Sequence, residues 1–323
     1  MFSFRTDLAL EAREIINENG VTSNLEGIET TEYGDENLKI TRVKITDEKG
    51  EKALGKRKGT YITIEAPSLT EHNPDIPERA ASALKDELSF LLGDLKGKTT
   101  LAVGLGNKDI TADSLGPRVV SGLLVTRHLF SEPMASFTEN LSPLCALSPG
   151  VLGITGIETA EIIKGVCEHV RPESVIVIDS LASRKTERVC TTIQITDTGI
   201  SPGSGIGLRN SAIDSETLGI PVIAIGVPMV VDAATIANDA IDGVIDVLLS
   251  ECKSDEDFYH VLKNVDREEK YTLIRSVLSD KPLFVTPKEI DASAERVSKV
   301  VTDGINRAVH SNISSDDISA LTS

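Results

Sequence analysis

The sequence predicts an α/β protein with a mostly parallel sheet flanked by helices. Short runs of uninterrupted apolar residues recur through the middle of the chain, and stretches with helical spacing separate them. A strand that is apolar on both faces has to be covered on both faces, as the strands of parallel sheets are. Aromatic residues make up only 3% of the 323 residues, and Trp is absent. The core must therefore be built from Val, Ile, Leu and Ala.

The N-terminal part is expected to contribute a helix, a hairpin and a second helix. Residues 7–19 have the pattern of an amphipathic helix that ends at Gly20. Residues 38–64 alternate between apolar and polar types, which predicts two strands joined by a turn at residues 47–50. Residues 77–95 begin with Pro at the first helical turn and predict a helix.

The predicted core spans about residues 97–250. Its apolar runs predict strands over 99–105, 174–178, 191–195 and 221–226. The stretches between and after them predict helices over 115–129, 156–170 and 231–249. From about residue 252 to 323 the chain is charged and helical in pattern, with a break at Pro282 and a restart near Pro287. Residues 8–323 are expected to form a single domain, with 252–323 as its helical C-terminal part.

Composition excludes several classes of function. The formal net charge is −17, and so acidic a chain repels a phosphate backbone, so we expect no direct contact with nucleic acid. No apolar run reaches the roughly 18 residues of a membrane span, and no secretory leader is indicated. The four cysteines form no CxxC pair, which argues against zinc. We expect a cytoplasmic protein without a cofactor.

Two aspartates stand where strands of the predicted sheet end. Asp113 follows the first core strand after a short loop, and Asp179 ends the second. Ligands of open parallel sheets bind beyond the carboxyl ends of the strands, so the pair is a candidate catalytic site. Each residue also has a structural interpretation. Asp113 can cap the helix that follows it, and Asp179 can accept a backbone N–H beside its own strand.

Glycine-rich loops accompany the two aspartates. Gly104, Gly106 and Asn107 form a tight turn after the first core strand, and Gly203 and Gly205 lie in a loop over residues 201–215. The GLGN sequence resembles the opening of a dinucleotide fingerprint, but its third glycine is replaced by an aspartate. A nucleotide-binding module stays open as an alternative. The chain has no HExxH motif and no GxSxG elbow.

Long sequence motifs follow one another over nearly the whole chain. They are RTDLALEA (5–12), VGLGNKDITADSLGP (103–117), SPGVLGITGIET (148–159), VIVIDSLASR (175–184), TIQITDTGISPGSGIG (192–207), GIPVIAIGVPMVVDA (219–233) and LFVTPKEID (283–291). In this order they resemble the germination proteases of spore-forming bacteria. Several long matches in one order are far more specific than any single motif.

This resemblance implies a fold similar to that of hydrogenase maturation endopeptidases, which bind metal through two acids and a histidine. Asp113 and Asp179 fall at the two acidic positions, but no histidine follows the strand at 191–195. The resemblance therefore implies an aspartate pair that acts without metal, in which one carboxylate is the base and the other the acid. A metal-dependent peptidase of the same fold remains the alternative. The turn at Gly104–Asn107 or the loop at Gly203–Gly207 is expected to stabilise the oxyanion.

The resemblance also implies the biology. The expected substrates are small acid-soluble spore proteins, which are degraded at germination in the spore core. The family is made as a zymogen in the forespore, forms homotetramers and removes its own N-terminal segment. Here the matching propeptide is residues 1–7, and the matching bond is Asp7–Leu8. Asp7 can instead serve only as the N-cap of the first helix.

Overall fold

The computed structural model describes residues 7–18, 26–71, 73, 75–131, 140–201, 212–251, 267–278, 283–311 and 313. Its strands are β1 (Ile28–Gly34), β2 (Lys39–Ile45), β3 (Gly59–Glu65), β4 (Thr100–Gly104), β5 (Leu144–Leu147), β6 (Ser174–Ser183), β7 (Thr192–Thr196), β8 (Val222–Asp232) and β9 (Phe284–Val285). Its α-helices are α1 (Ala9–Glu18), α2 (Glu48–Leu54), α3 (Asp75–Leu92), α4 (Leu115–Ser121), α6 (Leu152–Thr155), α7 (Thr159–Val170), α8 (Ser215–Leu218), α9 (Ala233–Glu251), α11 (Arg267–Val277) and α12 (Ile290–Val309). Short 3-10 helices are η1 (Thr111–Asp113), η2 (Arg127–Ser131) and η3 (Thr186–Arg188).

The strands form one mixed sheet in the order β1-β2-β3-β7-β8-β6-β4-β5, with β9 paired to β8. Among the strands of the described residues, the pairs β4–β5, β4–β6 and β6–β8 are parallel. The other five pairs are antiparallel. The α/β class is confirmed, but the prediction of a mostly parallel sheet is wrong. The physical reason is that the N-terminal hairpin does not stand apart: β3 pairs with β7 and extends the same sheet.

The predicted hairpin is confirmed in its strands and wrong in its connection. Strands β2 and β3 pair antiparallel, but helix α2 replaces the expected turn. Asp47 is the N-cap of α2, and its carboxylate accepts the backbone N–H groups of Lys49 and Gly50. Gly55 ends the helix in a left-handed conformation. Gly50 obscures the helical pattern, and it is needed because a Cβ there would overlap the carbonyl oxygen of Gly27.

Most of the predicted core elements are confirmed, with different ends. Strands β6 and β8 both run about five residues beyond their predicted ends, and they pair with each other along that extension. The helix predicted over 115–129 ends at Ser121, and only η2 follows it. Strands β1 and β5 were not expected. In the tail, a helix precedes the break at Pro282 and another follows Pro287, as predicted.

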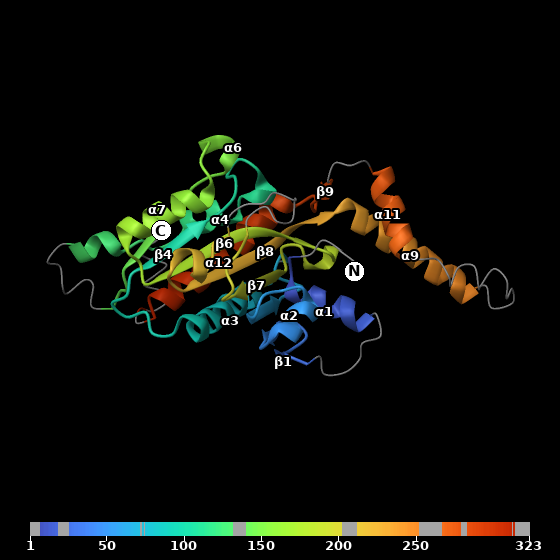
Figure 1. Cartoon of the computed structure of the whole chain (residues 1–323), viewed down its shortest axis with the longest axis horizontal. Helices are drawn as coiled ribbons and strands as arrows, with labels where there is room; N and C mark the ends of the chain where they lie inside the picture. Colours follow the sequence, from blue (N-terminus) through green and yellow to red (C-terminus); the bar gives the residue numbers. More distant parts are fainter. Residues whose placement is uncertain are drawn as a thin grey trace.

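Helices cover both faces of the sheet (Figure 1). On one face α3, α4 and α12 pack on alternate residues of the strands, such as Ile62, Ile176 and Ile225. The other face is covered at two separate places. Helix α7 packs on Val103 and Val177, and a smaller cluster joins α1 and α2 to β2 and β3. The strands between these two covers carry the candidate site.

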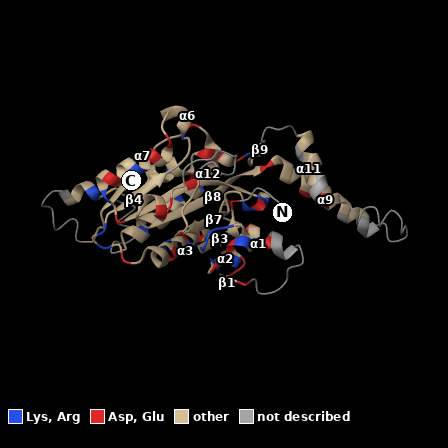
Figure 2. Cartoon of the chain, in the orientation of Figure 1, with Lys and Arg blue, Asp and Glu red and all other residues tan. Residues whose placement is uncertain are grey.

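Beyond the sheet, helices α9 and α11 lie side by side and extend from the end of β8 (Figure 1). No helix among the described residues is long and apolar enough to span a membrane. Charged side chains of both signs lie mainly on the helices, loops and outer strands, and the central strands carry few of them (Figure 2).

Candidate functional site

A row of residues at one level crosses the sheet between the two helical covers. Gln194 on β7 is in register with Gly226 on β8, and Gly226 is in register with Asp179 on β6. Paired residues of neighbouring strands point to the same face, so Gln194 and Asp179 project from one face. Two strand spacings, about 10 Å, separate their backbones. A Cβ on Gly226 would overlap the side chain of Leu181.

Asp179 lies within a strand rather than at its end. Strand β6 continues to Ser183. The Asp179 carboxylate accepts the N–H of the next residue, Ser180, at 2.9 Å. The backbone contact expected for a structural acid is therefore present. It occupies one oxygen of the carboxylate, Oδ1.

Asp113 is fixed by the turn that follows β4. It ends η1, and its Oδ2 accepts the backbone N–H of Asn107 at 2.8 Å. Gly106 has a φ of +105°, and a Cβ there would overlap the Asp113 carbonyl oxygen. The N-cap position of α4 is Ser114, so Asp113 does not cap that helix. The turn at Gly106 and Asn107 thus lies directly against Asp113, and the backbone N–H of Asn107 is hydrogen-bonded to its carboxylate.

A second close contact sets the position of Asp113 relative to the sheet. Gly104 at the end of β4 and Gly116 at the start of α4 face each other. A Cβ on either glycine would overlap the backbone of the other segment. The end of β4 also bonds to β6, since Leu105 donates its N–H to Ile178 at 2.8 Å. These contacts bring the loop of Asp113 beside Asp179.

The charge of Asp113 influences the ionisation of Asp179. Burial raises the pKa of Asp179 to about 8, and the charges of Asp113 and Asp7 add to that rise. Burial also raises the pKa of Asp113, while the Asn107 N–H acts in the opposite direction. A pair in which one carboxyl group has a pKa of about 8 holds at least one proton at neutral pH. Such a pair can supply one base and one acid at the same time.

The N-terminal chain reaches this site through Asp7. Its N–H donates to Ala182 O at 3.2 Å, and its Oδ2 accepts the N–H of Ala182 at 2.9 Å. Helix α1 begins at Ala9, so Asp7 lies one residue too early to be its N-cap. Leu8, which follows the bond predicted to be cut, is fully buried. Asp7 is therefore bonded to β6 and Leu8 is buried, so this bond does not lie in an exposed loop.

Two residues at the site escaped the sequence prediction. Lys56 Nζ donates to the carbonyl oxygen of Asp7 at 3.0 Å, and Gln194 Nε2 donates to the same oxygen at 3.2 Å. Lys56 belongs to a basic stretch, residues 56–58, that reads as a solvated loop. Gln194 stands between Ile193 and Ile195 in a buried strand, and this is the one signal that could have pointed to a buried polar contact.

The other predicted site residues are the glycines of the second loop. Gly203 and Gly205 lie outside the described residues. His310 is buried at the end of α12, where its Nε2 contacts Leu124 O at 3.0 Å and its Nδ1 accepts Ser142 N–H. In the described part of the chain, no three His, Cys, Asp or Glu side chains are grouped so that they could hold a metal ion.

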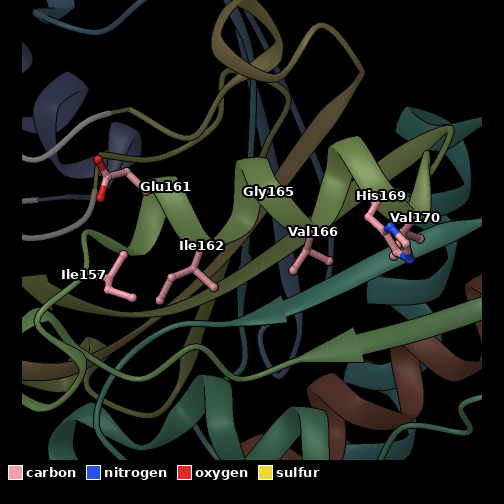
Figure 3. A pocket seen from close by; sticks show the side chains of 7 residues that line it. All are labelled: Ile157, Glu161, Ile162, Gly165, Val166, His169 and Val170. Carbon is pink, nitrogen blue, oxygen red and sulfur yellow. The ribbon is translucent and has the colours of Figure 1, made fainter.

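An apolar hollow lies elsewhere, along α7. Ile157, Ile162, Val166 and Val170 line it, together with His169 and Glu161 (Figure 3). None of its lining residues belongs to the row of polar groups described above. It holds no pair of acids, so it offers no comparable hydrolytic chemistry.

The fold and the site together define an α/β protein with two interacting carboxyl groups on one side of a mixed sheet. Comparison with known proteins adds the family. A model of the germination protease family matches residues 9–263 and 248–322. The germination protease of Caldanaerobacter subterraneus subsp. tengcongensis is 51% identical over 99% of this chain and 98% of its own length. The germination protease of Clostridium tetani is 46% identical over 98% of this chain and 99% of its own length. That of a Geobacillus species is 40% identical over 100% of this chain and 98% of its own length.

The chain therefore belongs to the germination protease family, and it is a protease. The family predicted from the sequence motifs is confirmed. A nucleotide-binding module and a metal-dependent peptidase gain no support from these findings.

Proposed function

We propose that this chain is an endopeptidase that hydrolyses small acid-soluble spore proteins during germination, with Asp113 and Asp179 activating the attacking water. The observation that carries the proposal is the raised pKa of Asp179, which comes from burial and from the charge of Asp113. The carboxylate of the pair takes a proton from water, and the resulting hydroxide adds to the peptide carbonyl carbon. The protonated partner donates its proton to the leaving nitrogen as the C–N bond breaks.

The same proposal includes synthesis as a zymogen. Residues 1–7 are the propeptide, and the chain cuts its own Asp7–Leu8 bond in mild acid. Two observations support this bond as the cleavage site. Asp7 is hydrogen-bonded to β6, and its charge contributes to the raised pKa of Asp179. Residence in the forespore and spore core, assembly as a homotetramer and the fold likeness to hydrogenase maturation endopeptidases stay predictions from the resemblance.

Replacing either aspartate by Asn tests the mechanism. Asn preserves the shape and removes the proton chemistry, so D113N and D179N should each lose at least about 100-fold of the cleavage rate. Both self-processing, followed by intact mass, and cleavage of a purified small acid-soluble spore protein are measured. Asp109 is an exposed acid of the same loop, and D109N should stay within about twofold of the wild-type rate. A variant of the pair that keeps more than about a tenth of the activity would remove that residue from the mechanism.

A further inference from the structure

The peptide bond between Asp7 and Leu8 is held at its carbonyl oxygen by two side chains from different elements. Lys56 follows α2 and reaches the oxygen with Nζ at 3.0 Å. Gln194 reaches it from β7 with Nε2 at 3.2 Å. A carbonyl that accepts from an ammonium group and an amide together is polarised toward attack at its carbon.

Further contacts hold the chain on either side of this bond. Ala9 donates its N–H to Gln194 Oε1 at 2.7 Å. The Gln194 amide therefore makes hydrogen bonds to the chain on both sides of Leu8, to Asp7 O and to Ala9 N–H. Asp7 is fixed on its other side by reciprocal bonds with Ala182. Leu8 and Ala9 are fully buried. The bond therefore has a defined place in the fold, as a substrate bond has in an active site.

The bond and the acid pair share one face of the sheet. Gln194 lies in the same row as Asp179, with Gly226 between them. Asp7 acts on the pKa of Asp179 through its charge, as Asp113 does. Lys56 is the basic group of this arrangement. Burial lowers its pKa, and the carboxylates of Asp7 and Glu11 favour its charged form.

Resting on the self-cleavage proposed above, we propose that Lys56 and Gln194 are the carbonyl-binding catalytic residues for the Asp7–Leu8 bond. Water loses a proton to the carboxylate of the acid pair and adds to the Asp7 carbonyl carbon. Negative charge develops on the carbonyl oxygen, where the Lys56 ammonium and the Gln194 amide stabilise it. The C–N bond then breaks, and the protonated acid gives its proton to the Leu8 nitrogen. The products are an Asp7 carboxyl group and a Leu8 amine.

These side chains take the role that was expected of the Gly104–Asn107 turn, whereas the other expected loop, residues 203–207, lies outside the described residues. The Asn107 N–H, in the turn that was expected to serve, is taken by Asp113. Lys56 and Gln194 have donors directed at a peptide carbonyl in the structure itself. An acidic residue before the cut also fits the site, because the Asp7 side chain accepts the Ala182 N–H and lies near the positive charge of Lys56.

A purely anchoring role predicts a different pair of effects. If Lys56 and Gln194 only held the chain around the Asp7–Leu8 bond in place, removing either would loosen that chain, so hydrogen exchange in α1 would rise while self-cleavage slowed. If they stabilise the charge on the oxygen, self-cleavage slows while hydrogen exchange in α1 stays at the wild-type level. Hydrogen exchange in α1 is therefore measured for each variant, and slower self-cleavage accompanied by raised exchange in both variants would mean that the two residues are anchors.

The test compares Lys56→Met and Gln194→Met in the 323-residue chain. Methionine keeps about the length of each side chain and removes its donor. Self-cleavage in mild acid is timed by intact mass and by the appearance of Leu8 as the new N-terminus. Each variant should process at least about 100-fold more slowly, which is the usual cost of one lost oxyanion donor. Lys58 is an exposed lysine two residues further on, and the Lys58→Met variant should process at the wild-type rate. The Lys56→Arg variant, which keeps a donor, should recover part of the rate that Lys56→Met loses.

The outcomes separate this inference from the function on which it rests. If the wild-type chain never yields a Leu8 terminus, the proposed self-cleavage fails. If the wild type processes normally and both Met variants keep within about threefold of its rate, or exceed it, Lys56 and Gln194 are not carbonyl-binding residues, and the proposed function stands. Melting temperatures of all variants are compared first. Because the two donors come from different elements, a folding defect in one variant leaves the other to decide.

Discussion

Asp179 is the residue in which stability and activity compete most directly. Burial and the charge of Asp113 raise its pKa to about 8, whereas an unfolded chain has an aspartate pKa near 3.9. Between these two values the folded protein holds a proton that the unfolded chain has lost. This group therefore makes folding less favourable as pH rises from about 4 to about 8, by up to about 1.4 kcal/mol per pH unit.

D179N should remove this pH dependence. Asn cannot ionise, so the free energy of unfolding of D179N should exceed that of the wild type by a margin that grows between pH 5 and pH 8. Urea denaturation of both proteins at several pH values in this range measures the margin. D109N should follow the wild type throughout. A margin that stays constant with pH would mean that the pKa of Asp179 is not raised.

At the level of single residues, the sequence identified the two aspartates but not their partners. Asp113 and Asp179 stand out because each follows or belongs to an apolar strand of the predicted sheet. Lys56 and Gln194 could not be found in this way. Their contacts with Asp7 join positions 49 and 187 residues away in the chain, and such contacts follow from packing rather than from local pattern.

At the level of elements, apolar runs predicted where strands begin better than where they end. The extension of β6 over residues 179–183 is not an apolar run, and its strand conformation comes from pairing with β8. The short helix α2 was missed because Gly50 interrupts its pattern, although Asp47 and Gly55 are typical cap residues. In both places a tertiary contact decides the local structure.

The contact between β4 and α4 gives a prediction at this scale. A Cβ on Gly116 would overlap the backbone of Leu105, and backbone cannot move aside as a side chain can. Gly116→Ala should therefore push α4 from β4, cost about 1–3 kcal/mol of stability and displace the loop of Asp113. Thermal unfolding and the cleavage rate measure the two effects.

Helix α7 supplies the matched control. Gly165 lies exposed in the helix interior with open space around its Cβ position. Gly165→Ala should stabilise the protein by about 0.5–1 kcal/mol and leave activity unchanged. If Gly116→Ala and Gly165→Ala have the same stability and the same cleavage rate, the close approach of β4 and α4 is not required for either.

At the scale of the whole molecule, one mixed sheet joins the N-terminal strands to the parallel core. The sequence predicted both parts but not that the hairpin belongs to the sheet. The pairing of β3 with β7 links positions about 130 residues apart, and no local signal specifies it. Its consequence is that α1, packed on β2 and β3, brings the N-terminal segment to the face that carries Asp179.

A buried ion cluster attaches α1 to this sheet. Arg188 in η3 is 5% exposed, and it pairs with Glu11 at 3.2 Å and with Glu14 at 2.6 Å, both on α1. It also pairs with Glu65 on β3 at 3.0 Å. Glu11 accepts the backbone N–H groups of Arg184 and Lys185 as well. One arginine thus links the helix that follows the Asp7–Leu8 bond to the strands beneath it.

Arg188→Met should loosen α1 without unfolding the sheet. Removing one partner of a buried ion cluster leaves carboxylates uncompensated, at a cost of about 3–5 kcal/mol. Most of these carboxylates belong to α1, so hydrogen exchange should rise in α1 and stay low in α3 and α12. Self-cleavage should slow as well, because the Asp7–Leu8 bond loses its fixed place beside Asp179. Arg79→Met, which breaks an exposed pair with Asp35, should change neither quantity measurably. Exchange that rises equally in α1, α3 and α12 would mean that the helix and the sheet unfold as one unit, and that the cluster stabilises the whole molecule rather than the N-terminal segment.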